Sequence, residues 1–199
     1  MLVYLHGFNS SAHSTKAREL ASWLAGQGLS HRFVSPSLPH GPMDAIRTVE
    51  AAIAGCDGED LCFVGSSLGG FYATCLAERH HARAVLLNPA IDPHLGLRAY
   101  LGPQTNLYTG EQYQLTEAHL AEWESLRVPR LSSGRYLLIV ETGDEVLDYR
   151  QAVNYYASAL QVVVEGGDHS LKSFPEHIPR IVEFAGMAPG RRSGTPAPL

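Results

Sequence analysis

Short runs of apolar and β-branched residues alternate along the chain with segments whose apolar positions repeat every three or four residues. Runs of the first kind predict buried strands, and the second pattern predicts amphipathic helices. Six strands are expected, over residues 2–5, 31–38, 61–64, 84–90, 135–141 and 160–167. Because helical patterns separate most of these strands, we predict an α/β protein with a mostly parallel sheet of about six strands and helices on both faces.

The connecting segments carry the helical patterns. Three helices are expected over residues 17–26, 45–54 and 68–79. A fourth, before the last strand, is expected to align four apolar residues on one face: Val153, Tyr156, Ala157 and Leu160. Residues 174–185 also look helical, but Pro179 has no N–H to donate. We therefore expect a short turn there, followed by a helix that begins at Pro179.

Two segments do not fit the alternation. Residues 91–134 form a long connection between the fourth and fifth strands, with a helical piece near residues 116–126. Connections of this length are usually functional, so we interpret the segment as a small cap or lid insertion. Its Trp123 could line an acyl pocket or belong to a core. The Gly- and Pro-rich residues 187–199 are expected to be a flexible tail, which leaves residues 1–186 as a single domain.

Composition narrows the possible partners and compartments. The chain has 199 residues, is 45% hydrophobic and carries a net charge of −5, which argues against nucleic acid as a partner. No apolar run approaches the length of a membrane span, and the first residues do not resemble a signal peptide. The 3 cysteines are odd in number and have no CxxC spacing, as is typical of reduced thiols. We expect a cytoplasmic protein; its oligomeric state is left open.

The most informative motif is GSSLG at residues 65–69, a GxSxG pattern between a predicted strand and a predicted helix. A sharp turn from strand to helix lifts the middle residue, Ser67, out of the fold, and the flanking glycines leave room for that turn. Ser66 is one residue too early in the motif and should face the sheet. A serine hydroxyl is a weak nucleophile, so the site also needs a base and a group that orients the base.

Candidates for those two groups follow later strands. Asp144 comes directly after the fifth strand, and His169 after the sixth. Because the carboxyl ends of parallel strands meet at one edge of a sheet, we expect Ser67, Asp144 and His169 to converge there, on three consecutive strands. Asp144 is the preferred acid because it precedes a Val-Leu pair, and Asp148 is the main alternative.

The LHGF segment at residues 5–8 also follows a strand. We assign the oxyanion hole to the backbone N–H groups of Phe8 and Leu68, which would stabilise the negative charge of an acyl-transfer intermediate. His6 is interpreted as a brace for this loop rather than a ligand or catalyst. No HExxH motif or Cys/His cluster is present, so neither a metal nor a cofactor is expected.

Taken together, these segments resemble the α/β-hydrolase superfamily, and more narrowly the YqiA-type small esterases. The likeness rests on HGFNSS, GSSLGG, LNPA, YTGEQY, TGDEVLDY and GGDHS, in that order, and spans about residues 2–186. It implies an α/β-hydrolase fold lacking the first two strands of the full superfamily sheet, and esterase activity on acyl esters or thioesters. The family's nucleophile, acid and base would fall on Ser67, Asp144 and His169. The Arg- and Pro-containing tail is not part of the family pattern.

The sequence therefore predicts a serine esterase or thioesterase that hydrolyses small acyl esters through an acyl-enzyme intermediate. Its partner would be a small-molecule acyl ester or thioester. Two alternatives stay open, an amidase or peptidase with the same triad and a hydrolase-fold binding protein without turnover. A phosphohydrolase is less favoured, because Leu5 stands before His6 where a phosphate site would use arginine.

Overall fold

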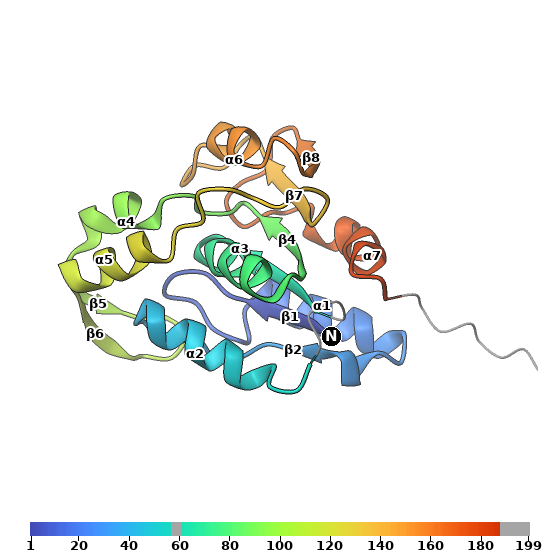
Figure 1. Cartoon of the computed structure of the whole chain (residues 1–199), viewed down its shortest axis with the longest axis horizontal. Coiled ribbons are helices and arrows are strands. Elements are labelled where there is room, and N and C mark those ends of the chain that lie inside the picture. The colour runs from blue at the N-terminus through green and yellow to red at the C-terminus, as the bar shows by residue number, and fades with distance from the viewer. Residues whose placement is uncertain (57–60, 188–199) are drawn as a thin grey trace, which may run out of the picture.

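The centre of the molecule is a six-stranded sheet in which every neighbouring pair of strands is parallel (Figure 1). This computed structural model describes residues 1–56 and 61–187. The strand order is β2-β1-β3-β4-β7-β8. The strands are β1 (Leu2–Leu5), β2 (Phe33–Val34), β3 (Cys62–Ser66), β4 (Arg83–Leu87), β7 (Tyr136–Glu141) and β8 (Leu160–Val164). The predicted six-stranded sheet is thus confirmed.

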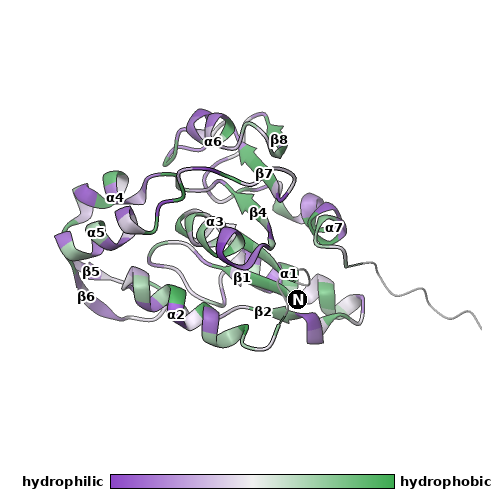
Figure 2. Cartoon of the chain, in the orientation of Figure 1, coloured by the Kyte–Doolittle hydropathy of each residue, from purple (hydrophilic) through white to green (hydrophobic). Residues whose placement is uncertain are grey.

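Helices cover both faces of the sheet. They are α1 (Thr15–Gly26), α2 (Pro42–Ala52), α3 (Leu68–His80), α6 (Tyr149–Tyr155) and α7 (Phe174–Phe184). Alternate strand residues point to opposite faces, so each face has its own core. Val3 and Phe63 pack on the side of α2 and α3, whereas Leu2 and Val64 pack on the side of α1 and α7. The central strands are accordingly apolar except near their ends (Figure 2).

The second strand is shorter than predicted. A 3₁₀ turn, η1 (Ser30–Arg32), occupies the start of the expected segment, and only Phe33 and Val34 pair with β1. Pro36 has no N–H to donate to a neighbouring strand, which limits how far the edge strand can extend.

The helix before β8 ends earlier than the apolar spacing predicted. α6 stops at Tyr155, Ala157 is exposed, and Leu160 is 64% exposed as the first residue of β8. The side-chain amide of Gln161 donates to the carbonyls of Val153 and Tyr156, which satisfies acceptors at the end of the helix. Pairing of Leu160 with the sheet therefore takes precedence over the helical pattern.

The expected interruption at Pro179 is also wrong. α7 runs unbroken from Phe174 to Phe184 with Pro179 inside it. An interior proline costs a helix about 3 kcal/mol, because one hydrogen bond is lost and the ring crowds the preceding turn. Three apolar side chains near it in the helix pack into the core beneath the sheet. They are Ile178, Ile181 and Val182, and each is at most 3% exposed. Their burial offsets the cost of the proline, whose own ring faces solvent.

The insertion predicted as a cap contains more structure than its sequence indicated. It holds α4 (Pro93–Gly96), the 3₁₀ turn η3 (Leu97–Tyr100), the antiparallel hairpin β5 (Gly102–Thr105) and β6 (Gln112–Leu115), and α5 (Glu117–Ser125). The hairpin was not predicted, because its strands are short and polar. Trp123 of α5 is fully buried and donates its indole N–H to the Tyr72 hydroxyl over 2.8 Å. It therefore belongs to the core rather than to a pocket.

The C-terminal end of the described chain packs against the core. Met187, which the sequence assigned to the tail, is 1% exposed and donates its N–H to the Val182 carbonyl. The rest of the predicted tail, residues 188–199, lies outside the described residues. Within residues 1–56 and 61–187, every helix is too short or too polar to cross a bilayer.

Candidate active site

Ser67 occupies a strained turn between β3 and α3. Its φ is 55° and its ψ is −122°, a combination that side-chain-bearing residues rarely adopt. The turn is held from both sides, because the Ser67 N–H donates to the Leu87 carbonyl and the Ser67 carbonyl accepts from the N–H groups of Gly70 and Ala90. This geometry presents the hydroxyl of Ser67 at the carboxyl edge of the sheet, as the GxSxG motif predicted.

The glycines of the motif are required by close packing. A Cβ built on Gly65 would lie 2.1 Å from the Gly69 carbonyl oxygen, and one built on Gly69 would lie 2.0 Å from the Leu5 carbonyl oxygen. Either contact is far shorter than any real side chain makes, so a larger residue would push α3 away from β1 and β3. The two glycines let the helix begin directly behind Ser67.

The three predicted triad residues lie in one hydrogen-bonded chain. The Nε2 atom of His169 is 3.1 Å from the Ser67 Oγ, and its Nδ1 atom is 2.8 Å from Oδ2 and 3.0 Å from Oδ1 of Asp144. The residues are separated by 25 and 102 positions in the sequence. These distances allow His169 to exchange a proton with Ser67 while Asp144 holds the other side of the ring.

Asp144 is held as a buried carboxylate. Its side chain is 1% exposed, and its Oδ1 accepts the N–H groups of both Val146 and Leu147 over 2.9 Å. Burial alone would raise the pKa of this carboxyl, but hydrogen bonds from His169, Leu147 and Val146 outweigh it and hold the pKa below its ordinary value. The Val-Leu pair that favoured Asp144 in the sequence thus supplies two of its donors.

The alternative acid and the alternative nucleophile lie apart from this chain. Asp148 begins α6, where its Oδ1 accepts the Arg150 N–H over 3.0 Å. Ser66 is the last residue of β3, is 7% exposed and lies beside the buried phenol of Tyr4. Neither side chain is hydrogen-bonded to His169 in the part of the chain that the structure describes.

The LHGF loop lies against Ser67. A Cβ built on Gly7 would be 3.1 Å from the Ser67 Cβ, so only glycine allows this approach without displacement. Within the described residues, the N–H groups of Phe8 and Leu68 donate to no other group. Both are therefore available to a substrate oxygen, as the predicted oxyanion hole requires.

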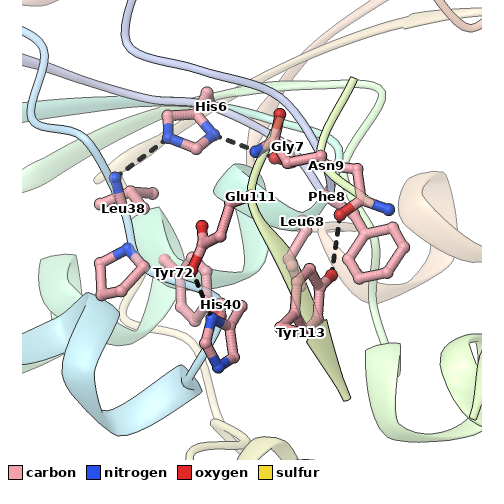
Figure 3. Close-up of a pocket in the computed structure, with 12 residues that line it drawn as sticks. His6, Gly7, Phe8, Asn9, Leu38, His40, Leu68, Tyr72, Glu111 and Tyr113 are labelled. Carbon is pink, nitrogen blue, oxygen red and sulfur yellow. Dashed lines mark hydrogen bonds and ion pairs between the residues drawn. The ribbon is translucent and has the colours of Figure 1, made fainter. Parts of the chain in front are cut away.

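His6 fixes the orientation of that loop. It is 5% exposed, its Nε2 accepts the Leu38 N–H over 3.0 Å, and its Nδ1 lies 3.0 Å from the Gly7 carbonyl oxygen (Figure 3). Since Nε2 accepts, we assign the ring proton to Nδ1, which donates to Gly7. Burial lowers the pKa of His6 and favours this neutral form. The Phe8 N–H belongs to the same peptide and points away from the Gly7 oxygen.

The hairpin of the insertion also holds the oxyanion loop. Asn9, at a φ of 49°, accepts the Tyr113 hydroxyl over 2.8 Å and donates to the Gln104 side chain over 3.2 Å. The Asn106 side chain donates to the Ser10 carbonyl over 2.9 Å. Figure 3 shows the Tyr113 hydroxyl pointing toward the Asn9 side chain. Both residues line a small cavity of about 30 Å³. The insertion thus shapes the site from beside Ser67.

Sequence reasoning missed Glu141, a buried acid that organises the loop carrying His169. This side chain lies at the end of β7 on a residue that is 1% exposed. Its carboxylate accepts the N–H groups of Asp168 (2.8 Å), Lys172 (3.2 Å) and Ser173 (2.8 Å) and the Ser173 hydroxyl (2.6 Å). Burial alone would raise the pKa of Glu141, but these bonds hold it below its ordinary value.

A second missed residue, Asn88, follows β4. The three triad strands were expected to be consecutive, which is wrong, because β4 lies between β3 and β7. Asn88 is 3% exposed, accepts the Glu141 N–H over 3.0 Å and donates to the carbonyls of Asp168 and His169 over 3.1 and 3.4 Å. The LNPA segment contained it, but no sequence signal connects it with a loop 80 residues away.

We predict that Glu141→Gln will loosen the His169 loop. An amide NH₂ cannot accept the donors that now meet the carboxylate, so about 2 kcal/mol of stability should be lost near neutral pH. Because the folded pKa of Glu141 is lowered, its contribution is complete above the ordinary carboxyl pKa and is lost as the pH falls through the lowered value. Urea unfolding at about pH 7 and about pH 3 should therefore show a loss that shrinks in acid.

The matched control is Glu165→Gln, since Glu165 is exposed at the end of β8. This variant should be as stable as the original protein at both pH values. If the chain hydrolyses esters, Glu141→Gln should also lower kcat about tenfold with little change in KM, because a displaced base slows chemistry more than binding. Equal stability of the two variants near neutral pH would contradict the role assigned to Glu141.

A cleft of about 650 Å³ opens beside Ser67 and His169. Its walls come from the oxyanion loop, the start of α1, the His169 loop and Tyr108 of the insertion. In the portion of the chain described, no three His, Cys, Asp or Glu side chains converge in a way that would hold a metal ion. The cleft is large enough for a small organic ester.

Comparison with known proteins places the chain in a sequence family. A model of UPF0227, an uncharacterised protein family, matches residues 1–186. A UPF0227 protein from Serratia proteamaculans is 24% identical over 188 residues, which cover 92% of this chain and 98% of that protein. One from Vibrio vulnificus is 21% identical over the same shares of both chains.

Solved structures share the fold. Alpha/beta hydrolase domain-containing protein 10 from mouse superposes with a TM-score of 0.70 at 15% identity, over 93% of this chain and 89% of that chain. Est1E from Butyrivibrio proteoclasticus gives 0.69 at 14% identity, over 92% and 85%. The monoacylglycerol lipase of Paleococcus ferrophilus gives 0.65 at 18% identity, over 94% of each. Est1E has also been solved with ferulic acid bound.

These similarities confirm the α/β-hydrolase fold, with a six-stranded parallel sheet and a small antiparallel insertion. At such low identities they concern the fold alone. The narrower resemblance to the YqiA-type esterases stays a prediction.

Proposed function

This chain belongs to the UPF0227 family, and we propose that it is a serine esterase or thioesterase that hydrolyses small acyl esters. The observation that carries the proposal is the continuous chain of hydrogen bonds from Ser67 through His169 to Asp144. The N–H groups of Phe8 and Leu68 beside the serine add to its support, since neither donates to another group among the described residues. Each component has the position that acyl transfer requires.

In the first half of the reaction, the Ser67 oxygen attacks the acyl carbonyl carbon. His169 Nε2 accepts the hydroxyl proton, since it already lies 3.1 Å from that oxygen. The carbonyl oxygen becomes negatively charged and is stabilised by the N–H groups of Phe8 and Leu68. His169 then donates the proton to the departing alcohol or thiol, which leaves an acyl group on Ser67.

In the second half, His169 removes a proton from water, and the resulting hydroxide attacks the acyl-enzyme. The tetrahedral intermediate collapses, the carboxylic acid is released and Ser67 recovers its proton from His169. In both halves the Nδ1–H group of the ring donates a hydrogen bond to the Asp144 carboxylate, so the neutral ring presents an unprotonated Nε2 to the reaction. The lowered pKa of Asp144 keeps it negatively charged beside the imidazolium that forms.

Two other functions use the same fold. An amidase or peptidase would need the same triad and, in addition, efficient protonation of the amine as it leaves. A binding protein without turnover would need none of the triad, yet in this chain Ser67, His169 and Asp144 are bonded in order. That order favours catalysis over binding alone.

A test combines active-site labelling with matched substrates. A fluorophosphonate should modify Ser67, as located by mass spectrometry of the digested protein. Aryl acetate, acetyl thioester and acetyl amide with similar leaving groups should then separate the bond classes, with the ester and thioester hydrolysed and the amide not. A feruloyl ester belongs in the same panel because Est1E binds ferulic acid.

Three results would overturn the proposal. They are absence of label at Ser67, preference for the amide, and labelling without turnover of any ester or thioester.

A further inference from the structure

We propose that the alcohol part of the substrate is a neutral, hydroxyl-rich group such as a sugar or a glycerol, bound in the cleft between Ser67 and the start of α1. This inference rests on the proposed esterase function and adds the substrate class. It follows from three features of the cleft, which are an unpartnered buried hydroxyl, an abundance of other hydroxyls and a balance of charges.

The first feature is Ser14, the residue before α1. It is 8% exposed, and its Oγ is buried without a hydrogen-bond partner among the described residues, although it lines the cleft. It lies beside the Tyr4 phenol without reaching hydrogen-bonding geometry. The backbone on both sides is fixed, since the Ser14 N–H donates to Ser11 and its carbonyl accepts from Arg18. A buried hydroxyl without a partner is costly, so a ligand hydroxyl would gain affinity once the Ser14 side chain turned from its buried position toward the cleft to meet it.

The second feature is the number of hydroxyl groups around Ser14. Six further hydroxyl side chains line the same cleft besides the nucleophile: Tyr4, Ser10, Thr15, Ser66, Tyr108 and Ser170. Each hydroxyl can both donate and accept, as each hydroxyl of a sugar can. Burial raises the pKa of Tyr4 to about 12, so its phenol stays protonated and can donate. The Ser170 hydroxyl already donates to Asp168. An apolar alcohol would cover the other hydroxyls without offering them a hydrogen bond.

The third feature is the balance of charge. The cleft is lined by two cations, Lys16 and Lys172, and by two anions, Glu19 and Glu145. The Lys172 ammonium forms an ion pair with Asp168 over 2.6 Å, so its positive charge is largely compensated. A phosphate or carboxylate would meet the two glutamates as well as Lys16, so an anionic alcohol is disfavoured. A neutral hydroxyl group can donate to the glutamates and accept from Lys16.

Lys16 and Tyr108 would complete the recognition of such a group. The Lys16 ammonium donates to the Ser170 carbonyl over 2.7 Å, which uses one of its three N–H donors and places it across the cleft toward the His169 loop. Tyr108 also lines the cleft and is 61% exposed. Its ring offers a flat apolar surface against which the C–H groups on one face of a sugar ring can pack. Together they allow both the polar edges and the apolar face to be contacted.

The experiment compares three acetyl esters that differ only in the alcohol. These are methyl O-acetylglucoside, cyclohexylmethyl acetate as the apolar analogue, and O-acetylglucose phosphate as the anionic analogue. The full-length protein should hydrolyse the glucoside with a kcat/KM at least about tenfold higher than either analogue, since a site that binds hydroxyls rejects a substrate without them. Equal rates, or preference for the apolar or the anionic ester, would overturn the inference.

A variant pair locates the recognition. Ser14→Ala keeps both backbone bonds of that residue and should lower the preference for the glucoside over cyclohexylmethyl acetate about fivefold, the usual effect of one lost hydrogen bond. Ser22→Ala, an exposed serine on the same helix, should leave the preference unchanged. An unchanged preference in Ser14→Ala would also overturn the proposed placement.

The two proposals fail in different ways. If phenyl acetate is not hydrolysed and fluorophosphonate does not label Ser67, the esterase proposal fails. If phenyl acetate is hydrolysed and Ser67 is labelled, but the glucoside has no advantage, only the inference about the alcohol fails.

Discussion

Replacing Ser67 by alanine is expected to lower kcat/KM for a reference aryl ester about a millionfold, which is the usual cost of losing the nucleophile of a triad. The variant should fold normally. The strained turn at φ 55° is held by backbone bonds from Ser67 to Leu87, Gly70 and Ala90, and none of these needs the hydroxyl. Steady-state kinetics, with the thermal midpoint followed by circular dichroism, would measure both effects.

The control for Ser67→Ala is the same substitution at Ser66. That hydroxyl lies one residue earlier, beside Tyr4, and forms no hydrogen bond with His169 among the residues described. Ser66→Ala should still take a fluorophosphonate label at position 67, whereas Ser67→Ala should take none. Labelling of a folded Ser67→Ala protein, or hydrolysis at more than a small fraction of the original rate, would show that another group is the nucleophile.

The sequence predicted the sheet because its central strands are covered on both faces. In these strands nearly every residue is buried, so the apolar runs over residues 61–64, 84–90 and 135–141 stood out without any knowledge of their neighbours. The positions of the triad followed from the same fact, since a residue directly after a parallel strand must lie at one edge of the sheet. Fold and candidate nucleophile were therefore both accessible from local pattern.

Contacts between distant segments were not accessible in this way. The helical spacing before β8 favoured a helix through Leu160, but pairing of that residue with Leu137 made it a strand. Pro179 is tolerated inside α7 only because its neighbours are buried against the sheet. The β5–β6 hairpin is polar and short, so its pairing could not be predicted from an alternation of apolar and polar residues. Each error arose where tertiary packing outweighed a local preference.

The residues that support the site were missed for the same reason, because their contacts join distant segments of the chain. Glu141 looked like an ordinary strand end, and its importance lies in donors 27 to 32 residues away in the chain. Asn88 contacts a loop 80 and 81 residues away. A sequence identifies groups that react, because their motifs are local, whereas groups that hold them in place are identified by contacts.

The choice between Asp144 and Asp148 shows how geometry separates two similar candidates. Both carboxylates accept backbone N–H groups two residues ahead, those of Val146 and Arg150 respectively. Only Asp144 also contacts His169, and its side chain is 1% exposed, whereas that of Asp148 is 47% exposed. Replacing Asp144 by asparagine therefore changes a hydrogen-bond acceptor of His169. Replacing Asp148 by asparagine changes only the cap of a helix.

Asp144→Asn is expected to lower kcat about 10⁴-fold, because it shifts the ring proton of His169 from Nδ1 to Nε2. The N–H groups of Val146 and Leu147 both donate to Oδ1, so the amide oxygen should take that position and the NH₂ should face the ring. His169 Nδ1 must then accept, its proton moves to Nε2, and Nε2 can no longer accept the Ser67 proton. Asp148→Asn should keep its rate, since asparagine caps a helix as well as aspartate. A large loss in Asp148→Asn, or near-normal turnover in folded Asp144→Asn, would assign the acid to another residue.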